Sequence, residues 1–243
     1  GFQCADGICL PPVEPLEPTQ VTRIAVGLHH TCAVRDDGSV ACWGRNSYGT
    51  LGQGIESLNL PPVQDVQLPK AALSVSLGHY SSCALLVDGT VWCWGLNNNG
   101  QLGTGDDANR LSPVWINQAG QCNAISLGAD HACAVRTDNQ VVCWGLGSDY
   151  QLGTGEALAV YDPTLVPGLT DAVRVSAGVD HTCVLRDGAT MVCWGKNSGF
   201  KAGQSTGTYV TTPTAYTKVV GLSGISAGGT HTCALSAGDG GGK

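Results

Sequence analysis

Cysteine and histidine are the residues of this sequence whose types and spacing could do chemistry. Twelve cysteines occur among 243 residues, and eight of them form four pairs whose members are ten residues apart. A high and even cysteine count indicates disulfide bonds or metal sites. The four pairs are Cys32 with Cys42, Cys83 with Cys93, Cys133 with Cys143, and Cys183 with Cys193.

A tight turn is predicted between the two cysteines of each pair. Asp37-Gly38 and Asp88-Gly89 lie near the midpoints of the first two pairs, and Asp-Gly between β-branched residues is a strong hairpin signal. A loop with an odd number of residues, one of them in the left-handed conformation, would set the two cysteines opposite each other. Their Cα atoms would then be about 4.5–5.5 Å apart, within disulfide range. In the fourth pair Asp187-Gly188 comes one residue earlier, so a different loop type is expected. Zinc ligands are usually two to four residues apart, so we predict disulfides and no metal.

Histidine recurs two residues before a cysteine at four places in the chain. An active site needs different groups that converge once, whereas these histidines repeat along the chain, so we expect each ring to bond neighbouring backbone as a structural residue. A ring of metal ligands is the alternative, and Ser81 would interrupt it. The histidines are His30, His131, His181 and His231.

Other signatures of catalysis or metal binding are weak. The sequence has no Gly-x-Ser-x-Gly elbow, His-Glu-x-x-His motif or phosphate loop, so we predict that the protein is not an enzyme and has no cofactor. Asp106, Asp107 and Asn109 could offer oxygen ligands to calcium, but they lack the full spacing of a calcium motif. A solvated loop is predicted there.

These residues belong to a repeat of about fifty residues. Units begin near residues 24, 75, 125, 175 and 225 with a Gly-x-x-His-Thr-Cys-Ala-Leu type of sequence. The first four units continue through Cys-Trp-Gly to a glycine-rich loop and a proline-bearing stretch, which leaves room for about four short strands. Four strands per unit are typical of a propeller blade. The tryptophans Trp43, Trp94, Trp144 and Trp194 share one register and are expected in the core.

The combined pattern Gly-x-x-His-Thr-Cys-Ala-Leu … Asp-Gly-x-Val-x-Cys-Trp-Gly-x-Asn-x-x-Gly-Gln-Leu-Gly resembles the regulator-of-chromosome-condensation repeat, most closely its cysteine-containing bacterial form. The resemblance covers Ile24 to Leu235. It implies a β-propeller, commonly of seven blades, that acts as a protein-binding platform through its loops. Members of the family include a secreted β-lactamase inhibitor and a nuclear exchange factor, so the shared feature is the architecture and not one activity.

We therefore predict an all-β propeller with four full blades and one blade that is shared by the termini or incomplete. Residues 1–23 are expected to form an N-terminal cysteine hairpin, with Cys4 paired to Cys9, followed by the proline-rich back half of a blade; residues 24–243 are the propeller repeats. Lys243 stands where the second cysteine of the fifth unit would fall. Cys122 and Cys233 stay unassigned, and five blades or a fragment of a longer ring are both open.

Composition limits the partners. The net charge is −7 with only 12 Lys and Arg, and no basic cluster is present, so we predict no nucleic-acid binding. No apolar run approaches the roughly 18 residues of a membrane span, so no membrane insertion is expected. Disulfides persist in oxidising compartments, which indicates an extracellular, cell-surface or periplasmic location.

The predicted function is non-enzymatic binding of a protein or surface polymer through propeller loops. Aromatic residues that depart from the repeat pattern are the candidate anchors, although packing between loops is an equal alternative. A structural subunit of a self-associating extracellular assembly is a second hypothesis. A carbohydrate-active propeller enzyme is a third, but it would need convergent carboxylates that the repeat lacks. The candidate anchors are Tyr48, Tyr150, Phe200, Trp115 and Tyr161.

Overall fold

The structure is a computed structural model that describes residues 3–5, 8–10, 19–57, 63–218 and 220–236. Its described residues form four antiparallel sheets of four strands and two sheets of two strands. We call the four-stranded sheets blades 1 to 4. Blade 1 contains β3 (Val21–Val26), β4 (His30–Arg35), β5 (Val40–Gly44) and β6 (Gln64–Val66), and blade 2 contains β7 (Ala72–Leu77), β8 (Ser81–Leu86), β9 (Val91–Gly95) and β10 (Arg110–Trp115). Blade 3 contains β11 (Cys122–Leu127), β12 (His131–Arg136), β13 (Val141–Gly145) and β14 (Val160–Leu165), and blade 4 contains β15 (Ala172–Ala177), β16 (His181–Arg186), β17 (Thr190–Lys196) and β18 (Tyr209–Tyr216).

The fifth unit contributes a sheet of two strands, β19 (Leu222–Ala227) and β20 (Thr232–Ser236). At the other end of the chain β1 (Gln3–Ala5) pairs with β2 (Ile8–Leu10), in a register that sets Cys4 opposite Cys9. Among the described residues, neither two-stranded sheet is joined to the other. The fifth unit thus contributes two strands in the described residues, and most of the proline-rich stretch predicted to share its blade, residues 11–18, lies outside them, so both predicted forms stay predictions.

The predicted hairpins form in all four blades. Cys133 lies opposite Cys143, and Cys183 opposite Cys193, in registers that continue without a shift along the second and third strands. The turn position six residues after the first cysteine is left-handed throughout, with φ of 78° at Gly38, and in the fourth blade it is occupied by Ala189 with φ of 59°. The fourth loop keeps the common register, but Gly188 is left-handed there too, with φ of 88°, whereas the matching aspartates of the other three loops are not, so the loop type differs as expected.

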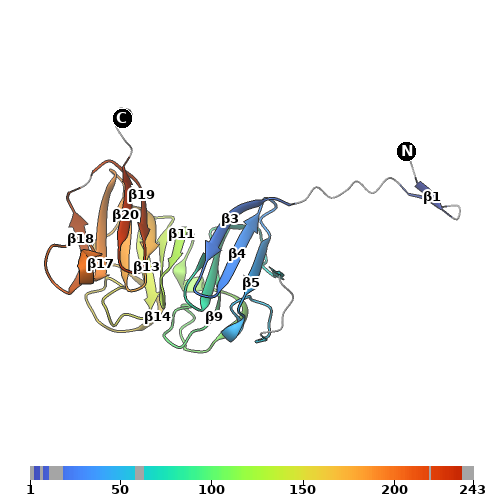
Figure 1. Ribbon diagram of the computed structural model, residues 1–243, viewed down its shortest axis with the longest axis horizontal. Helices are drawn as coiled ribbons and strands as arrows, with labels where there is room; N and C mark the ends of the chain where they lie inside the picture. The colour runs from blue at the N-terminus through green and yellow to red at the C-terminus, as the bar shows by residue number, and fades with distance from the viewer. Residues whose placement is uncertain (1–2, 6–7, 11–18, 58–62, 219, 237–243) are drawn as a thin grey trace.

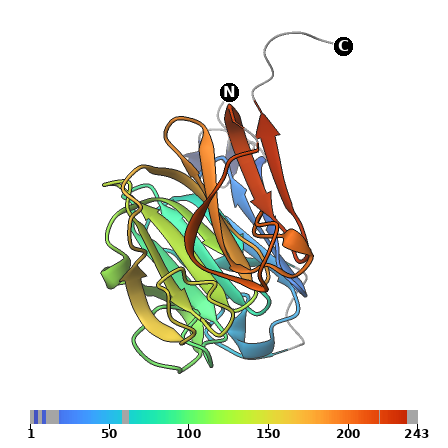
Figure 2. The same ribbon diagram turned by 90° about the vertical axis from the view of Figure 1, so that its left-hand side faces the viewer.

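The blades follow one another around a common axis in the order of the sequence, from the blue sheet of β3 to the red strands β19 and β20 (Figure 1; Figure 2 turns the view). The first strands face this axis, and the turn glycines that follow them approach the next blade closely. A Cβ on Gly128 would lie 2.3 Å from the carbonyl oxygen of Gly178, and one on Gly178 would lie 2.4 Å from that of Gly228. Glycine is required there because the neighbouring backbone occupies the space of a side chain.

The core lies between adjacent blades. Trp94, Trp144 and Trp194 are fully buried, as predicted, whereas Trp43 in blade 1 is only partly buried. The difference has a simple cause, because in the described chain no blade precedes blade 1 to cover it. For the same reason Val21, Ile24 and Val26 of β3 are exposed. Three short 3-10 turns, η1 (Ser47–Gly49), η2 (Asn117–Ala119) and η3 (Ser198–Phe200), complete the elements. In the described residues no helix has the length and apolarity needed to cross a bilayer.

Candidate functional site

One end of the blades carries most of the side chains that break the repeat. Here the turns between first and second strands, at 27–29, 78–80, 128–130, 178–180 and 228–231, lie beside the loops that follow the Cys-Trp-Gly strands. The strand registers place them together, since His30 pairs with Gly44 and His181 with Gly195. We call this end the loop face.

A cavity of about 330 Å³ opens along the axis between the five turns. Its wall is mostly backbone and small apolar side chains, with His79 as the one titratable side chain among its lining residues. The carbonyl oxygen of Ala129 accepts a hydrogen bond from the backbone N–H of His79 at 3.1 Å, which ties adjacent turns together. Such a wall can contact apolar groups, but it does not offer converging catalytic groups.

Three rings from blades 1 and 2 form a cluster on the loop face. The ring of Tyr80 lies 5.6 Å from that of His29 and 5.5 Å from that of Tyr48, centroid to centroid, and the two tyrosines meet edge to face. Tyr48 has φ of 63°, a left-handed backbone that bulky residues rarely adopt, and its N–H donates to Glu56 Oε1 at 2.9 Å. Its side chain is 37% exposed. The cluster therefore presents aromatic surface to solvent on an ordered loop.

A second aromatic pair lies on the loops of blades 3 and 4. The ring of Tyr150 lies 5.5 Å from that of Tyr209, and Tyr150 is also left-handed, with φ of 61°. The matching residue in blade 2 is Gly100, where a Cβ would lie 2.8 Å from Cα of Tyr161. Tyr161 is thus packed on the loop of the preceding blade, although part of its ring is exposed.

The five predicted anchors do not form one patch. Tyr48, Tyr150 and Tyr161 lie at the loop face. Trp115 is 55% exposed but pairs with Trp92 at the opposite end of its blade. Phe200 lies at the loop face as well, in the blade 4 loop position that matches Tyr150, and its side chain is 63% exposed beside the fifth unit. The residue-level site stays a prediction, and the geometry supports it for the loop-face tyrosines.

A charged network on the loop face was not predicted. Lys201 pairs with Asp180 and donates to the carbonyl oxygen of Gly229 at 3.1 Å, although its side chain is almost fully buried. Lys196 lies 3.7 Å from Asp180 and 3.6 Å from Asp149, and these carboxylates raise its pKa, with Asp149 the larger cause. The signal was in the sequence, because the first three units have no lysine at either position.

Burial also affects a carboxyl group in the third turn. Desolvation raises the pKa of Asp130, and the nearby His79 partly opposes this shift. Asp130 directly follows Ala129, which lines the axial cavity, so this carboxyl group lies on the loop face.

The repeated histidines are structural in their contacts, but their partner is not the backbone that was predicted. His131 Nε2 lies 2.9 Å from Thr182 Oγ1 of the next blade, and His30 Nε2 lies 2.9 Å from Ser82 Oγ. Desolvation lowers the pKa of His131 to about 3 and that of His30 to about 4. These buried rings are neutral at physiological pH. The described residues hold no group of three or more potential metal ligands.

The Asp106 loop is held by its own contacts. Asp106 Oδ2 pairs with Arg110 at 2.7 Å, and Oδ1 accepts from Thr104 Oγ1 at 2.8 Å. The hydrogen bond from Arg110 is the largest cause that lowers the pKa of this carboxyl. These contacts engage both carboxylate oxygens of Asp106, one of the three residues of the calcium alternative.

The sulfur atoms of the four hairpin pairs lie at disulfide distance, between 2.03 Å for Cys32–Cys42 and 2.14 Å for Cys133–Cys143. Cα atoms are 4.1 Å apart in every pair. Cys122 is a buried free thiol whose pKa is raised to about 11 by desolvation, and Cys233 is an exposed free thiol. The side chains of Cys4 and Cys9 lie outside the described residues, so their pairing stays a prediction.

Comparisons with known proteins identify the architecture. The family profile of the RCC1-like domain matches residues 3–238. Curated relatives include the probable E3 ubiquitin-protein ligases HERC4 of Rattus norvegicus, 34% identical over 103 residues, and HERC3 of Homo sapiens, 34% identical over 116 residues. These alignments cover 42% and 46% of this chain but only 10% and 11% of the relatives, so the chain spans about a tenth of their length.

Solved structures agree on the fold at low sequence identity. Human WBSCR16 superposes with a TM-score of 0.81 at 21% identity, over 92% of this chain and 59% of that one. Prp20p from Saccharomyces cerevisiae superposes with a TM-score of 0.80 at 19% identity, over 98% of this chain and 64% of that one. The chain thus spans about 60% of the solved propellers. The predicted repeat type is confirmed, and the chain belongs to the RCC1-like domain family.

Proposed function

We propose that this protein is an extracellular, non-enzymatic binding module whose loop face holds a protein partner. The observation that carries the proposal is the backbone of Tyr48 and Tyr150. Both residues adopt left-handed conformations, at a cost of about 1–2 kcal/mol each, and both present rings at the loop face. Strain of this kind tends to be retained at binding sites, where it fixes the contacting group.

The surroundings of these rings resemble a protein interface. Aromatic residues near an apolar centre with charged residues toward the edge are typical of such surfaces. Here the axial cavity is flanked by the Tyr48–Tyr80 rings on one side and by the Asp180–Lys201 pair on the other. Tyrosine contributes large contact area at a low cost in side-chain entropy, so it is a favourable anchor.

Related folds support a protein partner. The structure of yeast Prp20p was described together with its binding properties to Gsp1p and histones, and yeast RCC1 was solved bound to Kap60. The HERC relatives are probable E3 ubiquitin-protein ligases, and this chain matches about a tenth of their length. A binding role without chemistry of its own is consistent with a loop face that lacks convergent catalytic groups in the described residues.

An extracellular setting is supported by the cysteines. Four pairs at disulfide distance would be reduced in a normal cytosol, so an oxidising compartment favours them. The fold is also used outside cells, since the ectodomain of the Arabidopsis thaliana receptor kinase ACR4 superposes with a TM-score of 0.56 over 98% of this chain.

The proposal is tested by capture on the immobilised protein. Wild type, Y48A/Y80A and the matched control W115A, which removes an exposed ring from the opposite end, are exposed to cell-surface and medium fractions of the source cells. Bound proteins are quantified by mass spectrometry, and each candidate is purified and titrated by calorimetry. We expect Y48A/Y80A to weaken binding at least about tenfold and W115A to leave it within about twofold. Equal binding by all three proteins would exclude the tyrosine cluster, and binding of a surface polysaccharide alone would exclude a protein partner.

A further inference from the structure

Charged side chains are divided unequally between the two ends of the blades. Among the described residues, the end opposite the loop face carries seven carboxylates and seven basic side chains, so its charges balance. The loop face carries eight carboxylates and only four basic side chains. The excess negative charge of the described residues therefore lies on the face that carries the tyrosine cluster.

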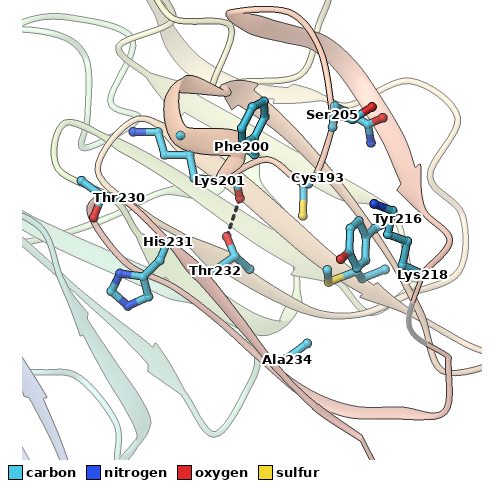
Figure 3. Close-up of a pocket in the computed structure, with 14 residues that line it drawn as sticks. Cys193, Phe200, Lys201, Ser205, Tyr216, Lys218, Thr230, His231, Thr232 and Ala234 are labelled. Atoms are coloured by element: carbon cyan, nitrogen blue, oxygen red, sulfur yellow. Dashed lines mark hydrogen bonds between the residues drawn. The ribbon is translucent and has the colours of Figure 1, made fainter.

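Most basic side chains of the loop face are engaged by carboxylates of the same face. The ion pairs are Arg110 with Asp106, Lys196 with Asp149 and Asp180, and Lys201 with Asp180. Figure 3 shows Lys201 extending from its loop toward the turn that carries Thr230, where it donates to the carbonyl oxygen of Gly229. The fourth basic residue, Arg45, donates from Nε to Ser47 Oγ at 2.7 Å. Five carboxylates of this face make no ion pair with a described residue: Glu56, Asp107, Asp130, Glu156 and Asp162.

Asp130 is the unpaired carboxylate that lies closest to the centre of the loop face. Its side chain makes no hydrogen bond within the described part of the chain, and it is partly buried. Desolvation raises its pKa, and His79 only partly opposes this shift. The charged form of Asp130 is therefore poorly solvated, so a cation that reached it would stabilise it.

Backbone contacts fix Asp130 beside Tyr80. The N–H of His79 donates to the carbonyl oxygen of Ala129 at 3.1 Å, and these two residues directly precede Tyr80 and Asp130. The carbonyl oxygens of Tyr80 and Asp130 each accept a backbone hydrogen bond, at 2.9 and 2.8 Å, from the loop of their own blade. Both side chains thus start from anchored backbone, on blades 2 and 3 that have a neighbouring blade on either side.

Tyr80 adds an aromatic surface next to this carboxylate. Its ring meets that of Tyr48 at 84°, with centroids 5.5 Å apart, so the two rings form a right-angled corner. The faces of aromatic rings carry partial negative charge and attract a cation within about 6 Å of the ring centroid. Glu56 contributes a second carboxylate to the corner, since its Oε1 accepts the N–H of Tyr48 at 2.9 Å.

We infer that the partner of the loop face is a basic protein, and that one of its arginine side chains lies against Tyr80 and pairs with Asp130. The inference rests on the proposed function of the loop face and adds the chemical class of its partner. Arginine fits both elements, because its planar guanidinium stacks on aromatic rings and donates to carboxylates. An acidic or apolar partner would instead bury Asp130 without a counter-ion, which weakens binding.

The test uses a fluorescently labelled peptide of four Gly-Arg repeats and its citrulline counterpart, which keeps the size and planar shape of arginine but lacks the charge. Binding to the full chain is followed by fluorescence anisotropy at low and at high ionic strength. We expect the arginine peptide to bind at least about tenfold more tightly than the citrulline peptide at low salt, and this advantage to shrink as salt is added.

Charge-matched variants locate the contact on the molecule. D130N removes the pairing carboxylate, whereas D36N removes an exposed carboxylate at the opposite end whose side chain has no contact within the described residues. We expect D130N to weaken binding of the arginine peptide at least about fivefold and D36N to change it less than about 1.5-fold. Y80L should weaken it about threefold and Y80F should restore most of that loss, because a ring and not only apolar bulk attracts the cation. Thermal unfolding verifies that each variant is folded.

Equal affinities for the arginine and citrulline peptides would overturn the inference, as would equal weakening by D130N and D36N. The same variants are then measured against the purified partner captured on the loop face. A partner that binds D130N as well as wild type would overturn the inference and leave the proposed function standing. Equal capture by wild type and Y48A/Y80A would count against the proposed function instead, and the peptide measurements would still decide whether Asp130 and Tyr80 hold arginine.

Discussion

Each buried histidine of the repeat is matched to a hydroxyl group on the next blade. The hydroxyl hydrogen of Thr182 is donated to Gln151 O, so its oxygen accepts the Nε2 hydrogen of His131. Nδ1 of His131 is buried without a partner, which is consistent with a neutral ring in the Nε2–H form. In blade 2 the histidine is replaced by Ser81, and the facing position of blade 3 is Ala132. The two halves of the link are therefore absent together.

Removing one half of the link is expected to cost more than removing both. T182A leaves the buried Nε2 hydrogen of His131 without an acceptor, so we expect a loss of about 1–3 kcal/mol in the free energy of unfolding. Adding H131S recreates the pair of Ser81 with Ala132 and should recover part of this loss. Urea denaturation of the four proteins gives the coupling energy, and additive effects within about 0.3 kcal/mol would contradict the link.

Stability should fall on mild acidification. The unfolded chain protonates histidine near its ordinary pKa of 6.5, whereas the pKa of folded His131 is lowered to about 3 and the pKa values of His30 and His181 to about 4. Below pH 6.5 the unfolded state binds more protons, so stability is complete above that pH and is lost as pH falls toward 4. We expect Tm to decline between pH 6.5 and 5, and to decline less in H131Q. If Tm declined equally with pH in both proteins, groups other than His131 would dominate the pH dependence of stability.

The sequence predicted the role of these histidines but not their partner. The partner hydroxyl lies 51 residues further along for His131 and 52 for His30, so the contact depends on how one blade is placed on the next. Repeat spacing does not contain that information. The Lys201–Asp180 pair escaped prediction for the same reason, although the lysine itself broke the repeat.

At the scale of the element, the hairpin is where prediction worked best. Asp-Gly turns and the ten-residue spacing define a register that the structure reproduces in blades 1 to 4. Local sequence sufficed because both strands and their turn lie within fifteen consecutive residues, such as 131–145 in blade 3. The fourth loop differs in type from the other three, as expected from the earlier Asp-Gly, because Gly188 and Ala189 are both left-handed there.

Replacing that alanine should stabilise the fourth hairpin. A189G removes a left-handed Cβ, while the backbone oxygen of residue 189 can still accept the N–H of Leu222. The relief of strain exceeds the added entropy of the unfolded chain, so we expect a gain of about 0.5–1 kcal/mol. Thermal unfolding measures it, and G188A, which imposes strain at the neighbouring positive φ, should change Tm in the opposite direction.

The paired cysteines should link the two strands of each hairpin by a disulfide bond. Peptide mapping without reductant is expected to recover Cys32–Cys42 and the three matching pairs as disulfides. Removing one bridge in C133A/C143A should then lower the free energy of unfolding by about 2–3 kcal/mol, since each closes a short loop. If mapping found free thiols, the extracellular part of the proposed function would lose its support.

At the scale of the molecule, the repeat predicted the blades and their order, and the described residues form four full blades and two strands of a fifth. The sequence could not place the loop aromatics relative to one another. Trp115 and Tyr161 look alike as departures from the repeat, yet they lie at opposite ends of the blades, because strand direction and register decide which end a residue occupies. The exposure of β3 and β20 could not be predicted from the sequence either, because it depends on which neighbouring blade covers each strand.

Stability should be graded along the array, because each blade packs mainly on its neighbours. Within the described residues, blades 2 to 4 are covered on both sides, whereas β3 and β20 each have a face without a neighbouring blade, with exposed residues such as Ile24 and Leu235. Hydrogen exchange should therefore be fastest in β19 and β20, intermediate in blade 1, and slowest in the second and third strands of blade 3. W144A, which removes a buried ring between blades 2 and 3, should speed exchange on both sides of that interface more than in β19 and β20. Equal protection of backbone amides from exchange in all blades would mean that the array unfolds as a single unit. Blade 1 and the β19–β20 sheet would then be no less stable than blade 3.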